Sequence, residues 1–146
     1  IFCKNISNEI LNNIPYSYTE KINNIYQDEF FYKIQSQSEK YKVEFKVKVV
    51  FIDKNIFVSI PAEVNSKYYV MLSKKFSKYN IIPLGLGDDI MGYLPFYNEV
   101  SEGGYEVNSI VNYGIDTPFS SISLKQFYFS LQSDIQKIIG KDKNDY

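Results

Sequence analysis

The strongest constraint on the fold is an alternating pattern over residues 41–52. Apolar residues alternate there with lysines and a glutamate, and the apolar set is Val43, Phe45, Val47 and Val49. Successive side chains of a β-strand point to opposite faces, so this pattern predicts a strand with one buried face and one wet face. A turn at 53–55 and a shorter apolar run at 56–60 then predict a β-hairpin.

The period changes after Pro61, which is typical of the first position of a helix. Apolar residues at helical spacing, among them Val64, Tyr68, Leu72 and Phe76, predict a helix beginning at Ala62. Residues 81–86 predict another buried strand. The order strand, helix, strand predicts an α/β fold in which helices cover a mixed sheet.

The flanking regions carry weaker patterns. Residues 1–40 are expected to be a connecting region with short helices, because 7–13 and 19–34 have loose helical spacing and 35–39 is a polar loop. Residues 87–118 predict a long loop rich in glycine, aspartate, asparagine and proline. Ser123 is expected to cap a last helix that ends at Gly140, followed by a polar tail over 141–146. The predicted apolar face of that helix is Leu124, Phe127, Tyr128, Leu131, Ile135 and Ile138.

Composition excludes several kinds of function. The 146 residues include no histidine, so a Ser–His or Cys–His nucleophile cannot be completed within this sequence. Cys3 is the single cysteine, which rules out an intrachain disulfide. All 16 basic residues are lysine and the net charge is −1, with no basic stripe, so nucleic acid is not an expected partner. The chain begins with Ile1, which suggests processing or a fragment.

Three places carry groups that could perform chemistry. Glu63 follows Pro61-Ala62 at the end of a predicted strand, where α/β proteins build sites, although a carboxylate complementing the helix dipole is the simpler reading. Asp88 and Asp89 could bind a divalent cation or act as solvated turn residues. Residues 101–107 contain paired glycines that permit positive φ, and a hairpin turn explains them equally well.

Taken together and in order, these segments resemble the neutral/alkaline non-lysosomal ceramidase family. The resemblance covers roughly residues 43–139 and corresponds to the last part of that family's catalytic domain. The motifs that carry it are Pro61-Ala62-Glu63, Gly92-Tyr93-Leu94-Pro95 and Glu102-Gly103-Gly104-Tyr105-Glu106. Residues 41–140 are therefore expected to be the C-terminal part of a ceramidase-like catalytic domain.

The resemblance implies a zinc ion held by two histidines, a glutamate and a tyrosine, with a zinc-bound water that attacks the amide bond of ceramide. The glutamate falls on Glu63 and the tyrosine on Tyr93, whereas both histidines and a serine near the metal lie upstream of this sequence. Asp88, Tyr105 and Glu106 are expected to surround the metal ligands or to shape the substrate loop. No catalytic residue is expected in this chain, which is expected to be inactive by itself.

Two departures from the family pattern motivate other hypotheses. Ala62 stands where the family usually has glycine, and Asp88-Asp89 replaces an asparagine–glycine pair. The main alternative is a catalytically inactive ceramidase-like module that serves binding or structure. The third hypothesis is a small α/β domain whose motif matches are accidental. The implied partners are ceramide, the remainder of the catalytic domain and a membrane surface, with a secreted or membrane-associated location.

Overall fold

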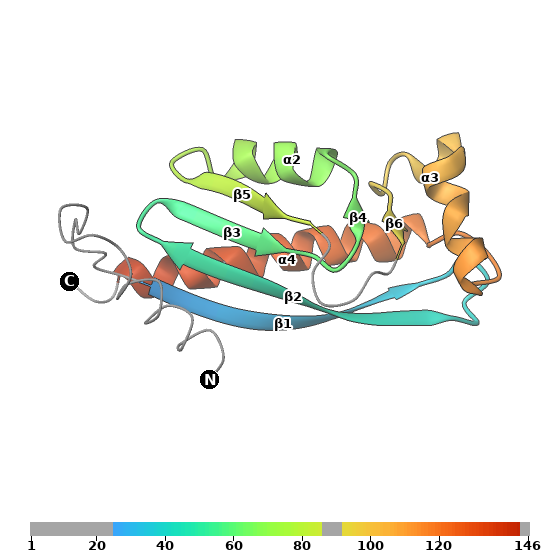
Figure 1. Ribbon diagram of the computed structural model, residues 1–146, viewed down its shortest axis with the longest axis horizontal. Coiled ribbons are helices and arrows are strands. Elements are labelled where there is room, and N and C mark those ends of the chain that lie inside the picture. Colours follow the sequence, from blue (N-terminus) through green and yellow to red (C-terminus); the bar gives the residue numbers. More distant parts are fainter. Residues whose placement is uncertain (1–24, 86–91, 144–146) are drawn as a thin grey trace, which may run out of the picture.

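The centre of the fold is a four-stranded sheet with the strand order β1-β2-β3-β5 (Figure 1). The computed structural model describes residues 25–85 and 92–143. Antiparallel pairing joins β1 (Ile25–Gln35) to β2 (Lys42–Ile52) along their whole length and β2 to β3 (Asn55–Ser59). The last strand, β5 (Asn80–Leu84), pairs with β3 in parallel. The predictions of a hairpin and of a mixed sheet are confirmed.

The two faces of the sheet differ in the way that the alternation predicts. The buried side chains of β2 are Phe45, Val47, Val49 and Phe51. Ion pairs lie on the opposite face, where the Lys33 Nζ is 2.5 Å from a Glu44 carboxylate oxygen and Lys46 reaches Glu29 at 3.1 Å. Phe31 projects on that same face and is 79% exposed. The fold therefore has its core on one side of the sheet.

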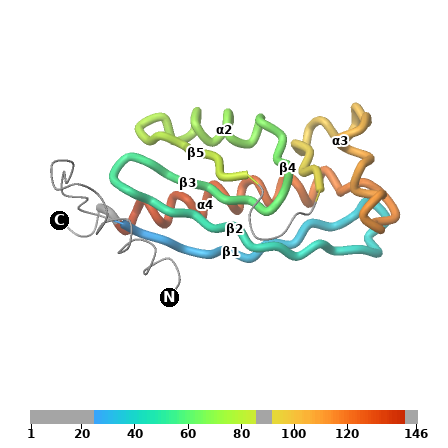
Figure 2. Tube along the Cα trace, in the orientation of Figure 1, coloured from blue at the N-terminus to red at the C-terminus, as the bar shows by residue number. Residues whose placement is uncertain are grey.

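Two helices cover the buried face, α2 (Lys67–Lys75) and α4 (Ser121–Lys143) (Figure 1). The tube in Figure 2 shows α4 running along the length of β1 and β2. All six positions of the predicted apolar face of α4 are buried. On its flank, Asp134 accepts a hydrogen bond of 2.8 Å from the hydroxyl of Tyr32 in β1. These contacts hold the long helix against the sheet.

Tyr68 of α2 lies where the helices meet the chain after β6. Its ring packs edge-on against Phe96 at 4.9 Å and lies 5.8 Å from Phe127 and 6.0 Å from Tyr128 of α4, measured between ring centroids. Its hydroxyl donates a 3.0 Å hydrogen bond to the buried carbonyl of Pro95. One side chain therefore joins both helices to the segment that follows β6.

A second, smaller sheet pairs β4 (Glu63–Val64) with β6 (Tyr93–Leu94) in parallel. Short helical turns follow, η2 (Val100–Glu102), α3 (Tyr105–Asn108) and η3 (Ser109–Tyr113). The predicted long loop over 87–118 is thus built from several short elements in its described part. Among the described residues, none of the helices combines the length and the apolar character needed to cross a bilayer.

The expected helical spacing over 19–34 is wrong for the described part, because Ile25–Gln35 is a strand. Every second side chain points inward, among them Phe30, Tyr32 and Ile34. Phe31 lies between them and is also apolar, which obscures the two-residue period in the sequence. Pairing with the whole of β2 decides the conformation, and such long-range pairing routinely overrides local propensity. The expectation for residues 1–24 lies outside the described residues.

The first helix starts five residues later than predicted. Helix α2 begins at Lys67 instead of Ala62, because the backbone of 63–65 pairs with β6. The amide of Glu63 donates to the Gly92 carbonyl at 2.9 Å, and the amide of Asn65 donates to the Leu94 carbonyl at 3.1 Å. The predicted strand over 81–86 forms at Asn80–Leu84, and its side chains are less buried than expected.

Both predicted ends of the last helix are also corrected. Ser120 lies at the N-terminus, where its Oγ accepts from the Ser123 amide at 3.5 Å. The Oγ of Ser123 instead accepts a 2.9 Å hydrogen bond from the Gln35 amide in β1. The helix continues through Gly140 to Lys143, which corrects the first part of the predicted polar tail, whereas 144–146 lie outside the described residues. Lys141 forms a 2.5 Å ion pair with Asp28 of β1.

Replacing Tyr68 with phenylalanine is expected to lower the free energy of unfolding by about 1–2 kcal/mol, because the buried Pro95 carbonyl loses its donor. Urea denaturation of the variant against the parent protein measures the change. Tyr113→Phe is the matched control, since Tyr113 is 59% exposed and its variant is expected to stay within about 0.5 kcal/mol of the parent. Equal losses in both variants would contradict the assigned role of Tyr68.

Candidate functional site

The candidate site lies where β4 and β6 run side by side. Glu63 is directly opposite Tyr93 in this parallel pair, and Val64 is opposite Leu94. Side chains opposite each other in neighbouring strands leave the same face of the sheet. The two residues proposed as metal ligands therefore project together, although 29 residues separate them in the sequence.

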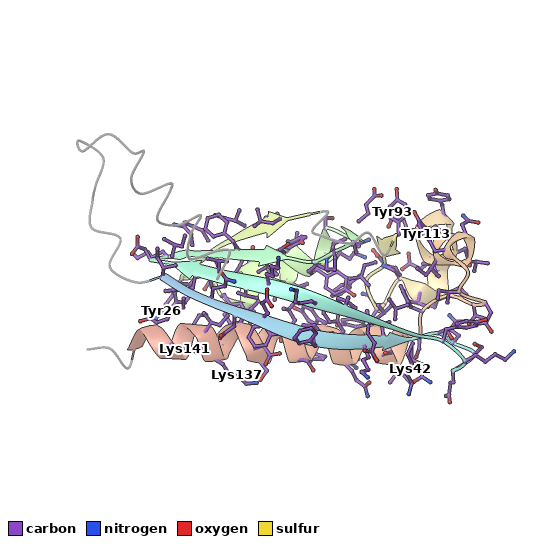
Figure 3. All side chains as sticks on the ribbon, turned by 60° about the horizontal axis from the view of Figure 1, so that its bottom comes forward. Tyr26, Lys42, Tyr93, Tyr113, Lys137 and Lys141 are labelled. Carbon is purple, nitrogen blue, oxygen red and sulfur yellow. The ribbon has the colours of Figure 1, made fainter. Side chains whose placement is uncertain are left out.

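The geometry of β6 depends on Gly92, the first residue of the Gly-Tyr-Leu-Pro motif. Its φ is +81°, in the region that favours glycine. A Cβ atom built there would lie 2.7 Å from the ring of Tyr113 in η3. Figure 3 labels Tyr93 and Tyr113 at the same end of the molecule. At the other end of β6, Pro95 is held by the hydroxyl of Tyr68.

The Glu63 carboxylate interacts with the phenol of Tyr93 and changes its acidity. This interaction is the largest cause that raises the pKa of Tyr93 to about 12, and desolvation adds to it. A carboxylate favours the protonated phenol and repels the phenolate, so both effects of Glu63 raise the pKa of Tyr93. The phenol of Tyr93 is consequently protonated at neutral pH.

Tyr105 and Glu106 lie beside this pair. The ring of Tyr105 packs against that of Tyr93 at 5.5 Å and 76°, an edge-to-face geometry. Tyr105 is 70% exposed, and the charge of Glu106 contributes to the raised pKa of Tyr93. The paired glycines before them have φ values of +70° and +91° and connect η2 to α3, so the hairpin turn considered for this segment is not formed.

Asn65 fixes the position of this loop, and sequence reasoning missed it. Its Nδ2 donates to a Glu99 oxygen at 2.7 Å and to a Glu106 oxygen at 3.2 Å, while its Oδ1 accepts from the Lys67 amide at 2.9 Å. Glu99 also forms an ion pair with Lys67. An asparagine just before a helix is a common capping signal, but nothing in the sequence indicates its carboxylate partners.

The described residues fit part of a zinc site. A carboxylate oxygen is an ordinary zinc ligand and a phenol oxygen a less common one, and the side chains of Glu63 and Tyr93 leave the same face of the small sheet. Two ligands are fewer than the three or four that zinc requires. Within residues 25–85 and 92–143, no group of three or more histidine, cysteine, aspartate or glutamate side chains is arranged to hold a metal. Asp88, also predicted near this site, lies outside the described residues.

The Glu63→Gln substitution is expected to lower the pKa of Tyr93 from about 12 toward the ordinary value of 10.0, because the negative charge that disfavours the phenolate is removed. Tyrosine ¹³Cζ resonances followed by NMR through an alkaline titration report the change, and Tyr93→Phe assigns the resonance. Glu44→Gln serves as the control, because Glu44 is paired with Lys33 on the exposed face of the main sheet. An unchanged Tyr93 titration in Glu63→Gln would contradict the observed pairing.

The comparisons with known proteins place the chain in no family. No family model matches the sequence, and neither the curated proteins nor the solved structures include a match.

Proposed function

We propose that this chain is the C-terminal part of a ceramidase-like, zinc-dependent amidohydrolase domain, in which Glu63 and Tyr93 are two of the zinc ligands. The observation that carries the proposal is the pairing of Glu63 with Tyr93 across β4 and β6. The sequence motifs around both residues resemble those of the ceramidase family, and the pairing brings together the two positions that the resemblance selects.

The chain's own contribution to such a site is to supply and orient two oxygen donors. Glu63 is exposed, and its carboxylate faces the phenol of Tyr93. Backbone hydrogen bonds on both sides of the pair fix the separation of the strands. Zinc, when bound, would act as a Lewis acid that polarises an amide carbonyl and lowers the pKa of a coordinated water.

The remaining ligands must come from outside this sequence. Two histidines would complete a four-coordinate site, and the chain contains none. The proposal therefore requires the remainder of a catalytic domain as a partner, joined upstream or associated. By itself the chain is expected to bind zinc weakly.

The proposed substrate is ceramide, which carries an amide between two long apolar chains. Tyr105 supports this assignment, because its exposed ring lies against Tyr93 and offers an apolar surface next to the proposed reacting centre. Glu106 and Asn65 hold the segment that carries this ring. The role proposed for Tyr105 is to contact the substrate, and the role proposed for Glu106 is to position the loop.

A ceramidase-like module without catalysis is the second candidate. It is supported by the lack of histidine in the sequence, by Ala62 in place of glycine and by the Asp88-Asp89 pair. In that case the pairing of Glu63 with Tyr93 would be a purely structural contact, and the exposed aromatic surface at Tyr105 would bind a lipid chain or a protein. Ceramide hydrolysis by the complete protein would exclude this candidate.

The zinc content of the complete protein, containing the upstream region, is expected to fall at least about tenfold in Glu63→Ala and in Tyr93→Phe, because each change removes one of four ligands. Metal analysis of purified protein after dialysis measures the content, and release of fatty acid from ceramide measures activity. Glu102→Ala is the matched control, since Glu102 is an exposed glutamate in η2.

Zinc content that is equal in the parent, in Glu63→Ala and in Tyr93→Phe would refute the proposed ligands. Full zinc content with no hydrolysis of ceramide would keep the metal site and reject the substrate. Loss of zinc in Glu102→Ala to the same extent would show a general effect of removing acidic residues.

A further inference from the structure

The outer side of the helix layer carries exposed lysines. Residues 67–80 contain four lysines and no acidic residue. Lys67 is paired with Glu99 near the candidate site. Within the described part of the chain, Lys74, Lys75 and Lys78 have no ion-pair partner. All three are exposed.

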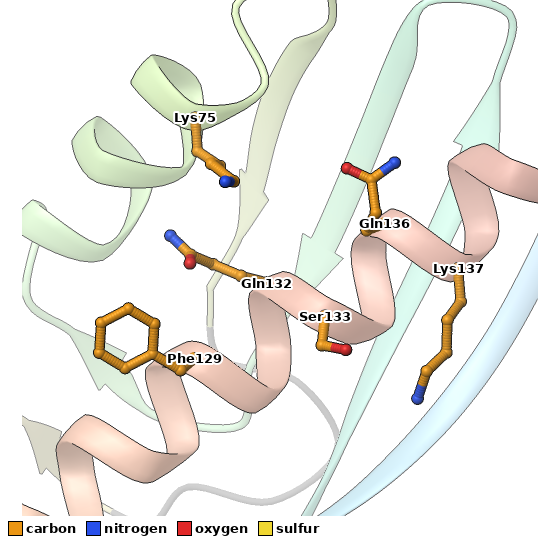
Figure 4. Close-up of a pocket in the computed structure, with 6 residues that line it drawn as sticks. All are labelled: Lys75, Phe129, Gln132, Ser133, Gln136 and Lys137. Carbon is orange, nitrogen blue, oxygen red and sulfur yellow. The ribbon is translucent and has the colours of Figure 1, made fainter.

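A groove between α2 and α4 opens on this side and has a volume of about 480 Å³. Figure 4 shows Lys75 of α2 and Gln132 of α4 pointing toward one another across it, with Phe129 beside them. The Nε2 of Gln132 donates to the Tyr128 hydroxyl at 2.7 Å, which fixes the orientation of that amide. Lys78 lines a smaller, adjoining groove of about 200 Å³ together with Lys75. Both grooves thus present ammonium groups to solvent.

Exposed apolar side chains lie among these lysines. Val70 is 50% exposed, Met71 is 37% exposed and Phe129 is 50% exposed. In a helix, residues four apart lie on the same side, so Val70 neighbours Lys74 and Met71 neighbours Lys75. Clustered lysines attract the phosphates of an anionic leaflet, and exposed apolar side chains beside them can reach the headgroup region.

We propose that this basic helix face, formed by Val70, Met71, Lys74, Lys75, Lys78 and Phe129, docks on an anionic phospholipid surface. Charge complementarity supports this occupant, because α4 contributes a single acidic residue over Ser121–Lys141, Asp134, which turns to Tyr32 and Lys137. The apolar side chains would enter the headgroup region, and the lysines would contact lipid phosphates.

Docking on lipid is separate from the zinc chemistry, because the basic helix face shares no residue with the pair of Glu63 and Tyr93. Carboxylates gather around that pair, at Glu63, Glu99 and Glu106. The two surfaces therefore have opposite charge although the whole chain has a net charge of −1. Failure of one proposal leaves the other intact.

Vesicle flotation with the full chain tests the proposal. The parent protein is expected to float with vesicles of equal parts phosphatidylcholine and phosphatidylserine, and much less with phosphatidylcholine alone. Changing Lys74, Lys75 and Lys78 together to glutamine is expected to weaken binding by about a hundredfold at low salt, since each lysine near an anionic leaflet contributes a factor of about five. Phe129→Ser is expected to weaken binding to the anionic vesicles as well.

Matched controls carry the same changes on other surfaces. The triple variant of Lys40, Lys42 and Lys54 to glutamine changes the net charge equally at the ends of the β-hairpins, and Phe31→Ser removes an exposed phenylalanine from the opposite face of the sheet. Both controls are expected to float like the parent. Thermal unfolding followed by circular dichroism establishes that each variant is folded.

Equal flotation with both kinds of vesicle, or full flotation of the Lys74, Lys75 and Lys78 variant, would overturn the proposal. Light scattering without vesicles tests a second copy of the chain as the occupant. A mass that falls from dimer to monomer in Phe129→Ser would assign the face to self-association and would also overturn docking on lipid.

Discussion

The packing of Tyr68 is the interaction on which the arrangement of this structure most depends. Its ring joins α2 to the aromatic residues of α4 and to Phe96, and its hydroxyl satisfies the Pro95 carbonyl. Glu63 lies before α2 and Tyr93 before Pro95, so Tyr68 ties the segments that carry both residues to the core. A core contact thus positions the candidate site.

The candidate site is held by contacts that are almost entirely non-local. Gly92 can adopt its positive φ and leave room for the ring of Tyr113, and Asn65 reaches two carboxylates more than thirty residues away. These constraints leave Glu63 and Tyr93 on the same face of the small sheet, where the carboxylate raises the pKa of the phenol. Two oxygen donors in such an arrangement are suited to share a cation once further ligands are supplied.

Several features of the site could be predicted from the sequence, and others could not. The motifs indicated Glu63, Tyr93, Tyr105 and Glu106, and the structure brings these four together. Asn65 was missed, because an amide that bridges two carboxylates has no local pattern. The basic helix face was missed for a different reason: its lysines are close together in the sequence, but the net charge of −1 averages them with acidic residues on other surfaces.

The sequence by itself determined the elements whose pattern is local: the β2–β3 hairpin, the apolar face of α4, and the strand–helix–strand order that yields a mixed sheet. Tertiary structure decided the rest. Ile25–Gln35 became a strand because β2 offered a full ladder of partners, and the start of α2 moved to Lys67 because backbone groups of 63–65 bonded to β6. Local periodicity reports which side chains can be buried together, whereas the partner of a backbone hydrogen bond is fixed only when distant segments meet.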